Sequence, residues 1–475
     1  IYGIISEDKK IQEWSVSKEI VCFNSIDEFM HSKIKKFDFL FSIVNDLILN
    51  ANILKLPHCF TVNYHYSLLP RYAGVNSTSW AILNGETSHG ITWHIATEGI
   101  DTGDILKQSI IPIEYDDTAI TLNIKCFNYA VAAFGILIKE LARKSYSRIS
   151  QKMNDRTYFG YNKRLPQEGF IDWNWSAKYI DRLFRATQFG NTKNSLGVIK
   201  IIIKQNAFIV KKIALSQEKS ILRPGTISFC SCDYLRIATK TNDILIEKLS
   251  DMTGKNVPVS QVVNDYKIVN GNQLNSLSNQ QIKNIQNYLL DSVQAEKFWI
   301  KQFLPFLYPA TVFSNNRKEM TTRNFSMIMP ILETLTKRIK KHIGAGYTIS
   351  EVIITSILIY LLRVKNESGF IIGYTSEILC KQLKGYECFF SNCLPLKCNI
   401  KESFDFIQSL KKTVRQLYKL KKYKTYSYDI FTRYPELAEL DNFHYPIHIC
   451  LTNSENFDPN FKNQSGLLIK INNFI

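Results

Sequence analysis

The sequence predicts an α/β protein that is divided into several domains. Its 475 residues are more than one core ordinarily serves, so two to four domains are expected. Strand-like and helical runs alternate up to about residue 145, which is typical of an α/β sheet. Short strands then recur at close spacing, and a second alternation of helices and strands follows residue 285. The predicted order is an α/β domain, a small OB-like β-barrel and another α/β lobe.

The first domain is predicted to cover residues 1–148. Apolar, β-branched and aromatic runs between turn residues predict its strands, over residues 37–44, 58–65, 90–96 and 105–113. A short helix is expected over 77–84, because Gly85 follows it as a natural C-cap. A long amphipathic helix is expected over 118–141, with Asp116 and Asp117 as its caps.

The second domain is predicted over residues 149–264, with a helix over 176–187. Its closely spaced strands predict a barrel, over residues 198–203, 207–214, 225–230, 235–238 and 243–249. Residues 265–284 are rich in Asn, Gln and Ser and are predicted to be a linker. The last lobe, residues 285–475, combines helices and strands, over residues 280–303, 350–363, 369–375, 403–420 and 447–452.

The composition describes a globular chain without a membrane span. Hydrophobic residues make up 45% and charged residues 21%, which does not fit a disordered protein. The longest apolar run, Val352–Leu362, is about half the length that a bilayer requires. The ten Cys residues lack both disulfide-scaffold and C-x-x-C spacing. We therefore expect a cytoplasmic protein with reduced thiols and no metal site.

The net charge of +17 has two readings. Lys is abundant together with Asn and Ile, which indicates a general compositional bias. Clusters such as residues 337–341 and 419–424 are then solvated helix faces. An acidic partner, whether nucleic acid, protein or a phosphorylated arm, fits the charge equally well.

A candidate site follows from the strand that ends at His65. Alternate side chains of a strand share a face, so Asn63 and His65 are predicted to lie together at its C-terminal end. Ligands bind at this end of the strands in open α/β sheets. A carboxamide and an imidazole side by side can both donate hydrogen bonds to one oxygen, as in an oxyanion hole. Asp101, in a glycine-flanked loop, is the acid expected to orient and charge His65.

Two motifs around these residues resemble a known family. Residues 63–74 (NYHYSLLPRYAG) and residues 99–104 (GIDTGD) are similar to the two signatures of 10-formyltetrahydrofolate-dependent formyltransferases. The resemblance implies that Asn63 and His65 stabilise the tetrahedral oxyanion formed when an amine attacks the formyl carbon. It implies that Asp101 orients His65 and helps to manage the proton of the amine.

The resemblance also implies a folate co-substrate, with no metal and no covalent nucleophile. It places the folate against two loops, formed by Ser67, Leu68, Leu69 and Pro70 and by Ile100, Thr102, Gly103 and Asp104. Ser67 is then a loop residue and not a nucleophile. His89 and His94 lie near these motifs, and we expect each to have a structural or substrate-edge role.

The flanks of the motifs narrow the resemblance. Residues 37–45, 72–86 and 89–94 are similar to formyltransferase domains that open nonribosomal peptide synthetases. Residues 198–250 are similar to the C-terminal barrel of tRNA and free-standing formyltransferases, and do not discriminate between them. The resemblance implies a carrier protein with a phosphopantetheine arm as partner and an adenylation domain downstream.

The last lobe resembles part of a condensation domain. The similar stretches are residues 296–301, 389–396 and 429–437. The His-His-x-x-x-Asp-Gly motif of condensation chemistry is absent, and His444 and His448 are spaced too differently to replace it. We therefore expect this lobe to be an inert docking or structural remnant.

The sequence leaves open whether the first sheet is complete and which acceptor is formylated. The first strand of the sheet, expected before Ile1, is missing, so one central position would be empty and the chain is expected to be a fragment. The acceptor is expected to be an aminoacyl thioester on a carrier protein, while an aminoacyl-tRNA and a nucleotide-linked amino sugar remain alternatives. A non-catalytic scaffold is the alternative of a different class.

Overall fold

The protein was analysed as a computed structural model. The structure describes the following residues: 1–32, 36–45, 47–304, 333–343, 346–365, 370–401, 403–440, 445, 447–454 and 467–472. They divide into two units. Unit 1 contains residues 1–163 and 185–189, and unit 2 contains residues 164–184 and 190–475.

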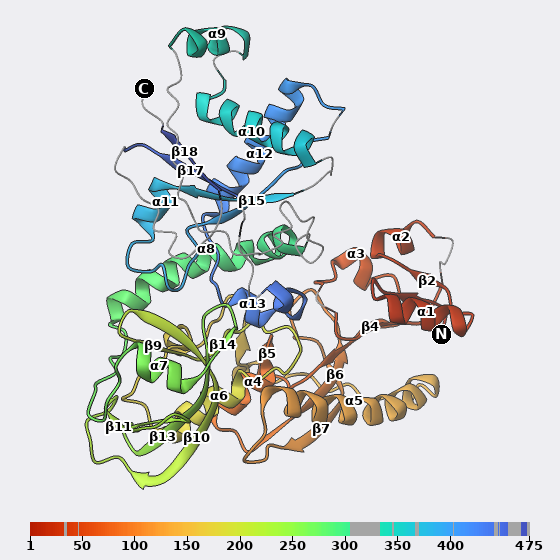
Figure 1. Ribbon diagram of the computed structural model, residues 1–475. Helices are drawn as coiled ribbons and strands as arrows, with labels where there is room; N and C mark the ends of the chain where they lie inside the picture. Colours follow the sequence, from red (N-terminus) through yellow and green to blue (C-terminus); the bar gives the residue numbers. More distant parts are fainter. Residues whose placement is uncertain are drawn as a thin grey trace. The chain divides into compact units, whose positions relative to one another are not determined.

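The central sheet of unit 1 has the strand order β3-β4-β6-β7 (Figure 1). Its strands match the four predicted segments within about two residues at each end: β3 (Phe39–Ser42), β4 (Phe60–His65), β6 (Ser88–Ile95) and β7 (Ile105–Pro112). β3 and β4 are parallel, whereas β6 is antiparallel to both β4 and β7. This register pairs Asn63 with His94, which determines the geometry of the site.

Two smaller parallel pairs complete the strands of unit 1. β1 (Ile4–Ile5) pairs with β2 (Cys22–Phe23), and β5 (Ala73–Gly74) pairs with β8 (Tyr158–Phe159). Within the described residues, the β1-β2 pair forms a sheet of its own instead of extending the central one. The pairing of β5 with β8 fixes the loop that follows β4.

The helices of unit 1 are α1 (Lys9–Ser17), α2 (Ile26–Met30), α3 (Ala51–Leu54), α4 (Ser77–Asn84) and α5 (Ala119–Ala142). Of these, α5 packs on β6 and β7 of this sheet and α4 packs on α5, whereas α1 and α2 pack on β2. α4 ends at Gly85 in the left-handed conformation, as predicted. The cap of α5 is Thr118, whose hydroxyl accepts from the backbone N–H of Thr121, and not the predicted Asp116 or Asp117.

α5 packs on the sheet through one apolar stripe. Leu122, Cys126, Ala133 and Leu137 recur at helical spacing and are buried. The rest of the helix exposes further apolar side chains. Of the described helices, α5 alone is long and apolar enough to cross a bilayer, and one such helix is weak evidence of a membrane span. Of its 18-residue apolar stretch, 28% is buried.

Unit 2 begins with α6 (Ala177–Ala186), which continues into unit 1, and an antiparallel sheet. The strands are β9 (Lys200–Ile203), β10 (Asn206–Lys219), β11 (Ile227–Cys230), β12 (Leu235–Ile237), β13 (Asn242–Ser250) and β14 (Asn256–Val257). The strand order is β11-β12-β13-β10-β9, and β14 pairs with β13. Within the described residues, β11 and β9 do not pair, so the sheet does not close into the OB-like barrel that the sequence predicts. Register shifts along β10 bend the sheet.

The C-terminal part of unit 2 has a second sheet with the order β16-β15-β17-β18. Its strands are β15 (Ile371–Ser376), β16 (Leu394–Lys397), β17 (Ile447–Thr452) and β18 (Leu467–Asn472). The helices of unit 2 after β14 are α7 (Val259–Asp265), α8 (Asn279–Phe303), α9 (Glu333–Ile343), α10 (Ile349–Lys365), α11 (Glu377–Gln382), α12 (Phe406–Tyr423) and α13 (Ile430–Arg433). Short 3₁₀ turns lie at Met153–Asp155, Pro166–Gly169 and Pro435–Leu440.

The two parts of unit 2 share one apolar core. Phe170, Val198 and Ile209 from the first part lie in the same buried cluster as Trp299 and Phe390 from the second. The segment 265–284, predicted to be a linker, takes part in this packing. The N–H of Leu274 donates to the carbonyl of Gly225, and α8 begins at Asn279.

A buried group of charges also joins the two parts of unit 2. Lys200 lies 3.0 Å from Asp429, and Arg433 Nε donates to the same carboxylate at 3.0 Å. Arg433 and the hydroxyl of Tyr434 both donate to Glu296. Opposing charges raise the pKa of Arg433 further and hold that of Asp429 far below its usual range, although burial opposes both shifts. The charged forms are therefore the stable ones.

Candidate active site

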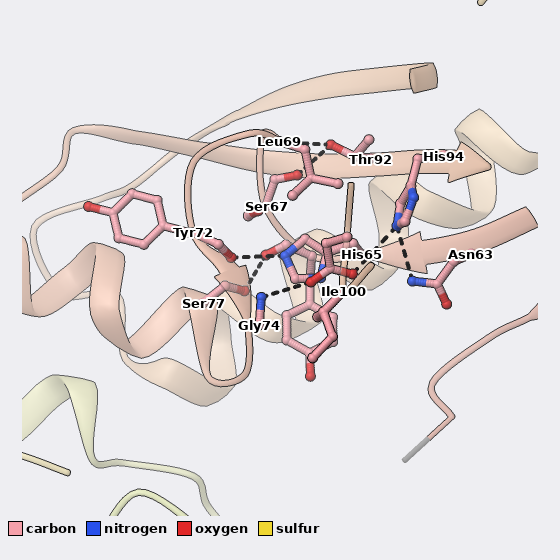
Figure 2. A network of polar contacts seen from close by, with 12 residues as sticks. Asn63, His65, Ser67, Leu69, Tyr72, Gly74, Ser77, Thr92, His94 and Ile100 are labelled. Carbon is pink, nitrogen blue, oxygen red and sulfur yellow. Dashed lines mark hydrogen bonds and ion pairs between the residues drawn. The ribbon is translucent and has the colours of Figure 1, made fainter. Parts of the chain in front are cut away.

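The candidate site lies at the C-terminal end of β4, in unit 1. On one face of β4, the side chains of Val62 and Tyr64 are buried in the core. Asn63 is half-buried and His65 is buried. The two side chains therefore leave the opposite side of the strand together, as the alternation predicts. Figure 2 shows both near the ring of His94 and the loop that carries Asp101.

His65 is held at both ring nitrogens. Its Nε2 lies 2.9 Å from the carbonyl oxygen of Tyr72, and its Nδ1 lies 3.6 Å from Asp101 Oδ2. A carbonyl only accepts, so Nε2 carries the proton and Nδ1 of the neutral ring is the basic atom. Burial lowers the pKa of His65 and outweighs the opposite effect of Asp101.

These contacts correct two expectations. The Nε2–H of His65 is engaged by Tyr72, so His65 and Asn63 do not present two donors side by side in this conformation. Asp101 was expected to orient and charge His65, yet the pKa of His65 is lowered overall, and Nδ1 of the neutral ring has no proton to donate to the carboxylate. A neutral ring beside a carboxylate is suited to accept a proton.

Asn63 contacts His94 on the neighbouring strand. The Nδ2 of Asn63 lies 3.2 Å from Nε2 of His94, and Nδ1 of His94 lies 2.9 Å from the carbonyl oxygen of Ile95. Because that carbonyl must accept, Nδ1 of His94 carries a proton, and its Nε2 can accept from the amide of Asn63. One hydrogen of the Asn63 amide is thereby engaged, and the second can donate to a ligand oxygen.

Asp101 bridges the two imidazoles. Its carboxylate lies 3.6 Å from Nδ1 of His65 and 3.6 Å from Nε2 of His94, and it accepts from the N–H of Gly74 at 2.7 Å. Burial favours the neutral acid, yet the contacts with His94 and His65 and the N–H of Gly74 together lower the pKa of Asp101 to about 2. Its backbone has a φ of 53°, an uncommon conformation for a residue other than glycine.

Hydrogen bonds hold the loop after β4 in place beside the site. The hydroxyl of Ser67 donates to the carbonyl of Arg71 at 2.7 Å, and Thr92 on β6 contacts the backbone of both Ser67 and Leu69. Ser67 and Leu69 are buried, whereas Leu68 and Pro70 are half-buried. Ser67 thus has the contacts of a loop residue, and the side chains of Leu68 and Pro70 are the ones accessible from this loop.

The loop 99–104 is held by side chains from the segment after α5. Gln151 donates to the carbonyls of Asp101 and Gly103, and Ser150 donates to Asp104 at 3.1 Å. Thr102 shares a hydrogen bond with Thr97, while the side chain of Ile100 is exposed. Their contacts with folate stay a prediction.

His94 is the site residue that sequence reasoning missed. It was expected to have a structural or substrate-edge role, yet it contacts both Asn63 and Asp101. Only the antiparallel register of β4 and β6 places it there, and that register is not readable from the motif. His89, by contrast, donates to the carbonyl of Tyr66, and burial lowers its pKa to about 4, as for a structural histidine. Among the described residues, no group of three or more His, Cys, Asp or Glu could hold a metal ion.

Comparison with protein families identifies two segments of the chain. A model described as formyl transferase matches residues 30–134, and one described as formyl transferase, C-terminal domain, matches residues 164–267. These two segments are formyltransferase domains. The similarity to formyltransferases predicted from the two motifs is confirmed for these two segments. Asn63, His65, His94 and Asp101 all lie within the first domain.

Two relatives span these domains to different extents. The bifunctional polymyxin resistance protein ArnA of Wigglesworthia glossinidia brevipalpis is 36% identical over 197 residues, which cover 41% of this chain and 29% of that protein. The methionyl-tRNA formyltransferase of Clostridium beijerinckii is 28% identical over 269 residues, covering 56% of this chain and 84% of that protein. The chain thus spans less than a third of the length of the first relative.

Solved structures with a partial likeness include two proteins that were solved with folate compounds. WlaRD, a sugar 3N-formyl transferase solved with dTDP and 5-N-formyl-THF, is 23% identical, with a TM-score of 0.41 over 52% of this chain and 87% of that chain. HypX from Aquifex aeolicus, solved with tetrahydrofolic acid, is 15% identical, with a TM-score of 0.42 over 58% of this chain and 50% of that chain.

Proposed function

We propose that the chain transfers a formyl group from 10-formyltetrahydrofolate to an amine, with Asn63, His65 and Asp101 as the catalytic group. The observation that carries the proposal is the cluster at the end of β4. There an amide hydrogen, a neutral imidazole and a charged carboxylate converge within formyltransferase domain residues. Acyl transfer from an N-formyl donor requires an oxyanion donor and a proton acceptor.

Each residue has a defined task in this reaction. The amine nitrogen forms a bond to the formyl carbon, and the carbonyl electron pair moves onto the oxygen. The second amide hydrogen of Asn63 stabilises that oxyanion. The proton lost by the amine moves to the neutral imidazole of His65, whose positive charge Asp101 then stabilises. The oxyanion collapses, the bond from carbon to N10 of the folate breaks, and N10 takes the proton.

The proposed acceptor is an aminoacyl thioester on a carrier protein, in the cytoplasm. The flanks of the two motifs and the condensation-like stretches of residues 285–475 support a place in nonribosomal peptide initiation. An aminoacyl-tRNA is the second candidate, because the methionyl-tRNA formyltransferase is matched over 84% of its length. A nucleotide-linked amino sugar is the third.

One assay separates the three acceptors. The full chain is incubated with 10-formyltetrahydrofolate and, in parallel, with aminoacyl carrier protein, aminoacyl-tRNA or a nucleotide amino sugar. N-formyl product is then measured by mass spectrometry. We expect product mainly from the carrier-bound amine. Product from tRNA alone would refute the carrier assignment, and a folded chain that yields no product from any acceptor would favour the non-catalytic scaffold.

A further inference from the structure

The positive charge of the chain belongs to one unit only. Residues 1–163 contain as many basic as acidic residues, so residues 164–475 account for the whole net charge of +17. A general compositional bias would have charged both units. The unit that contains the candidate site is thus almost neutral, and the basic surface lies elsewhere.

Helix α12 concentrates this charge. Between Phe406 and Lys424 it carries no acidic residue, and its basic residues are all exposed: Lys411, Lys412, Arg415, Lys419, Lys421, Lys422 and Lys424. Its opposite face is buried through Leu410, Leu417 and Leu420, and α12 packs against α10 (Figure 1). Lys411, Lys412, Arg415, Lys419 and Lys422 share one outward face by helical spacing, and from Lys411 to Lys424 the charges extend over about 20 Å at a rise of about 1.5 Å per residue. We call this set of charges the α12 face.

The surroundings of the α12 face favour a protein as its partner. Tyr418 on α12 is 67% exposed, and α10 beside it exposes Tyr360 by 67% and Val364 by 63%. Protein interfaces combine apolar and aromatic side chains with a charged rim in this way. Only Arg415 has the planar fork that suits phosphate groups, whereas the other basic residues are lysines.

We propose that the α12 face binds an acidic protein, the carrier that delivers the amine. This inference rests on the proposed function, since it assigns the partner that brings the acceptor. The face is also rigidly attached. The segment after α12 reaches Asp429 and Arg433, whose buried charges join Lys200 of the formyltransferase C-terminal domain and Glu296 of α8. A partner bound to α12 is therefore bound to the same compact unit as that domain.

The test reverses charge on the α12 face of the full chain. The variant combines Lys411→Glu, Arg415→Glu and Lys419→Glu. Its matched control combines Lys219→Glu, Arg223→Glu and Lys240→Glu, exposed residues elsewhere in unit 2 with the same change in charge. Binding of a labelled acidic carrier protein with a loaded aminoacyl phosphopantetheine arm is measured by anisotropy without folate, and labelled tRNA serves as the second probe.

We expect the α12 variant to weaken carrier binding at least about tenfold and the control to change it less than about twofold. Binding to the unaltered chain should also weaken with salt. Unchanged carrier binding by the folded α12 variant would overturn the inference, and so would an effect confined to tRNA. The three glutamine substitutions at the same positions replace the variant if it does not fold. Because binding is read without transfer, failure of the proposed function would appear separately, as no formyl product.

Discussion

At the scale of single residues, the site depends on how hydrogen atoms are distributed. The carbonyl of Tyr72 fixes the proton of His65 on Nε2, and that of Ile95 fixes the proton of His94 on Nδ1. Nδ1 of His65 and Nε2 of His94 consequently face Asp101, and the amide of Asn63 keeps one hydrogen for a ligand. Each contact can be removed by a single substitution.

Asn63→Ala and His65→Ala should each lower the rate of formyl transfer by about a hundredfold or more. The first removes the oxyanion donor and the second removes the proton acceptor, and losses of this size are usual for such groups. Steady-state rates with the preferred acceptor check this prediction. Asn45→Ala, at an exposed position of unit 1, is the control. A rate like that of the unaltered chain would refute the assignment.

His94→Leu should slow transfer by about ten- to hundredfold, because Asn63 and Asp101 lose the ring that positions them. His94→Gln should recover part of the rate, since its side-chain oxygen can still accept from Asn63. If the role of His94 were purely structural, the two variants would transfer the formyl group at equal rates whenever both are folded. We expect instead that kcat falls more than KM rises, and that the pH profile of kcat shifts.

His89 should make unit 1 sensitive to acid. Burial lowers its pKa to about 4, so the unfolded chain binds the proton more readily than the folded one. The free energy of unfolding should then fall as the pH drops from about 6.5 towards 4, by up to about 3 kcal/mol from this residue. Chemical denaturation across that range measures it. His89→Gln should flatten the slope, and an unchanged slope would contradict the prediction.

At the scale of elements, the loop 99–104 depends on a close approach of its backbone to β6. A β-carbon at Gly103 would overlap with the carbonyl oxygen of Ile95, at the end of β6. The loop 99–104 can therefore lie against the strand only with glycine at this position. This contact brings Asp101 to the imidazoles of β4 and β6.

Gly103→Ala should consequently reduce both transfer and stability. Displacing the loop from β6 should destabilise unit 1 by about 1 to 3 kcal/mol and weaken the contact of Asp101 with His65. Gly135→Ala is the matched control, because nothing lies within 4 Å of its β-carbon and it stands in the exposed part of α5. The control should stabilise the helix by about 1 kcal/mol. Thermal unfolding and transfer rates distinguish the two.

Much of this architecture is readable from the sequence where the signal is local. The helix that ends at Gly85 and the strand that ends at His65 follow from capping and alternation. The partners across strands are not local. His94 faces Asn63 only because β6 runs antiparallel to β4, and the carbonyl of Tyr72 reaches His65 only because the following loop folds back.

At the scale of the whole molecule, composition could indicate a linker at 265–284 but could not show what that segment contacts. Its apolar residues are few, yet Ile268 and Leu274 are buried. The core that joins residues 164–267 to the C-terminal helices is built from contacts distant in sequence, such as Phe170 with Phe389. The buried charges of unit 2 belong to the same class of long-range contact.

Arg433→Met should destabilise unit 2 by about 3 to 5 kcal/mol. The substitution removes the cation that Glu296 and Asp429 share and leaves their buried charges only partly compensated, by Lys200 and Tyr434, which is costly. Lys212→Met is the control, since Lys212 is exposed and its partner Glu247 is only half-buried, so their pair should be worth no more than about 1 kcal/mol. Urea denaturation followed by tryptophan fluorescence compares them, and equal losses would contradict the assigned role of the network.

The shared core of unit 2 bears on how this chain can be cut and recombined. A boundary placed after residue 267, where the second matched domain ends, would expose Phe170, Val198 and Ile209. It would also separate the buried charge of Lys200 from its partner Asp429. A hybrid protein built from this chain should therefore keep residues 164–475 together. The portable module is set by the buried side chains and is longer than the matched domain.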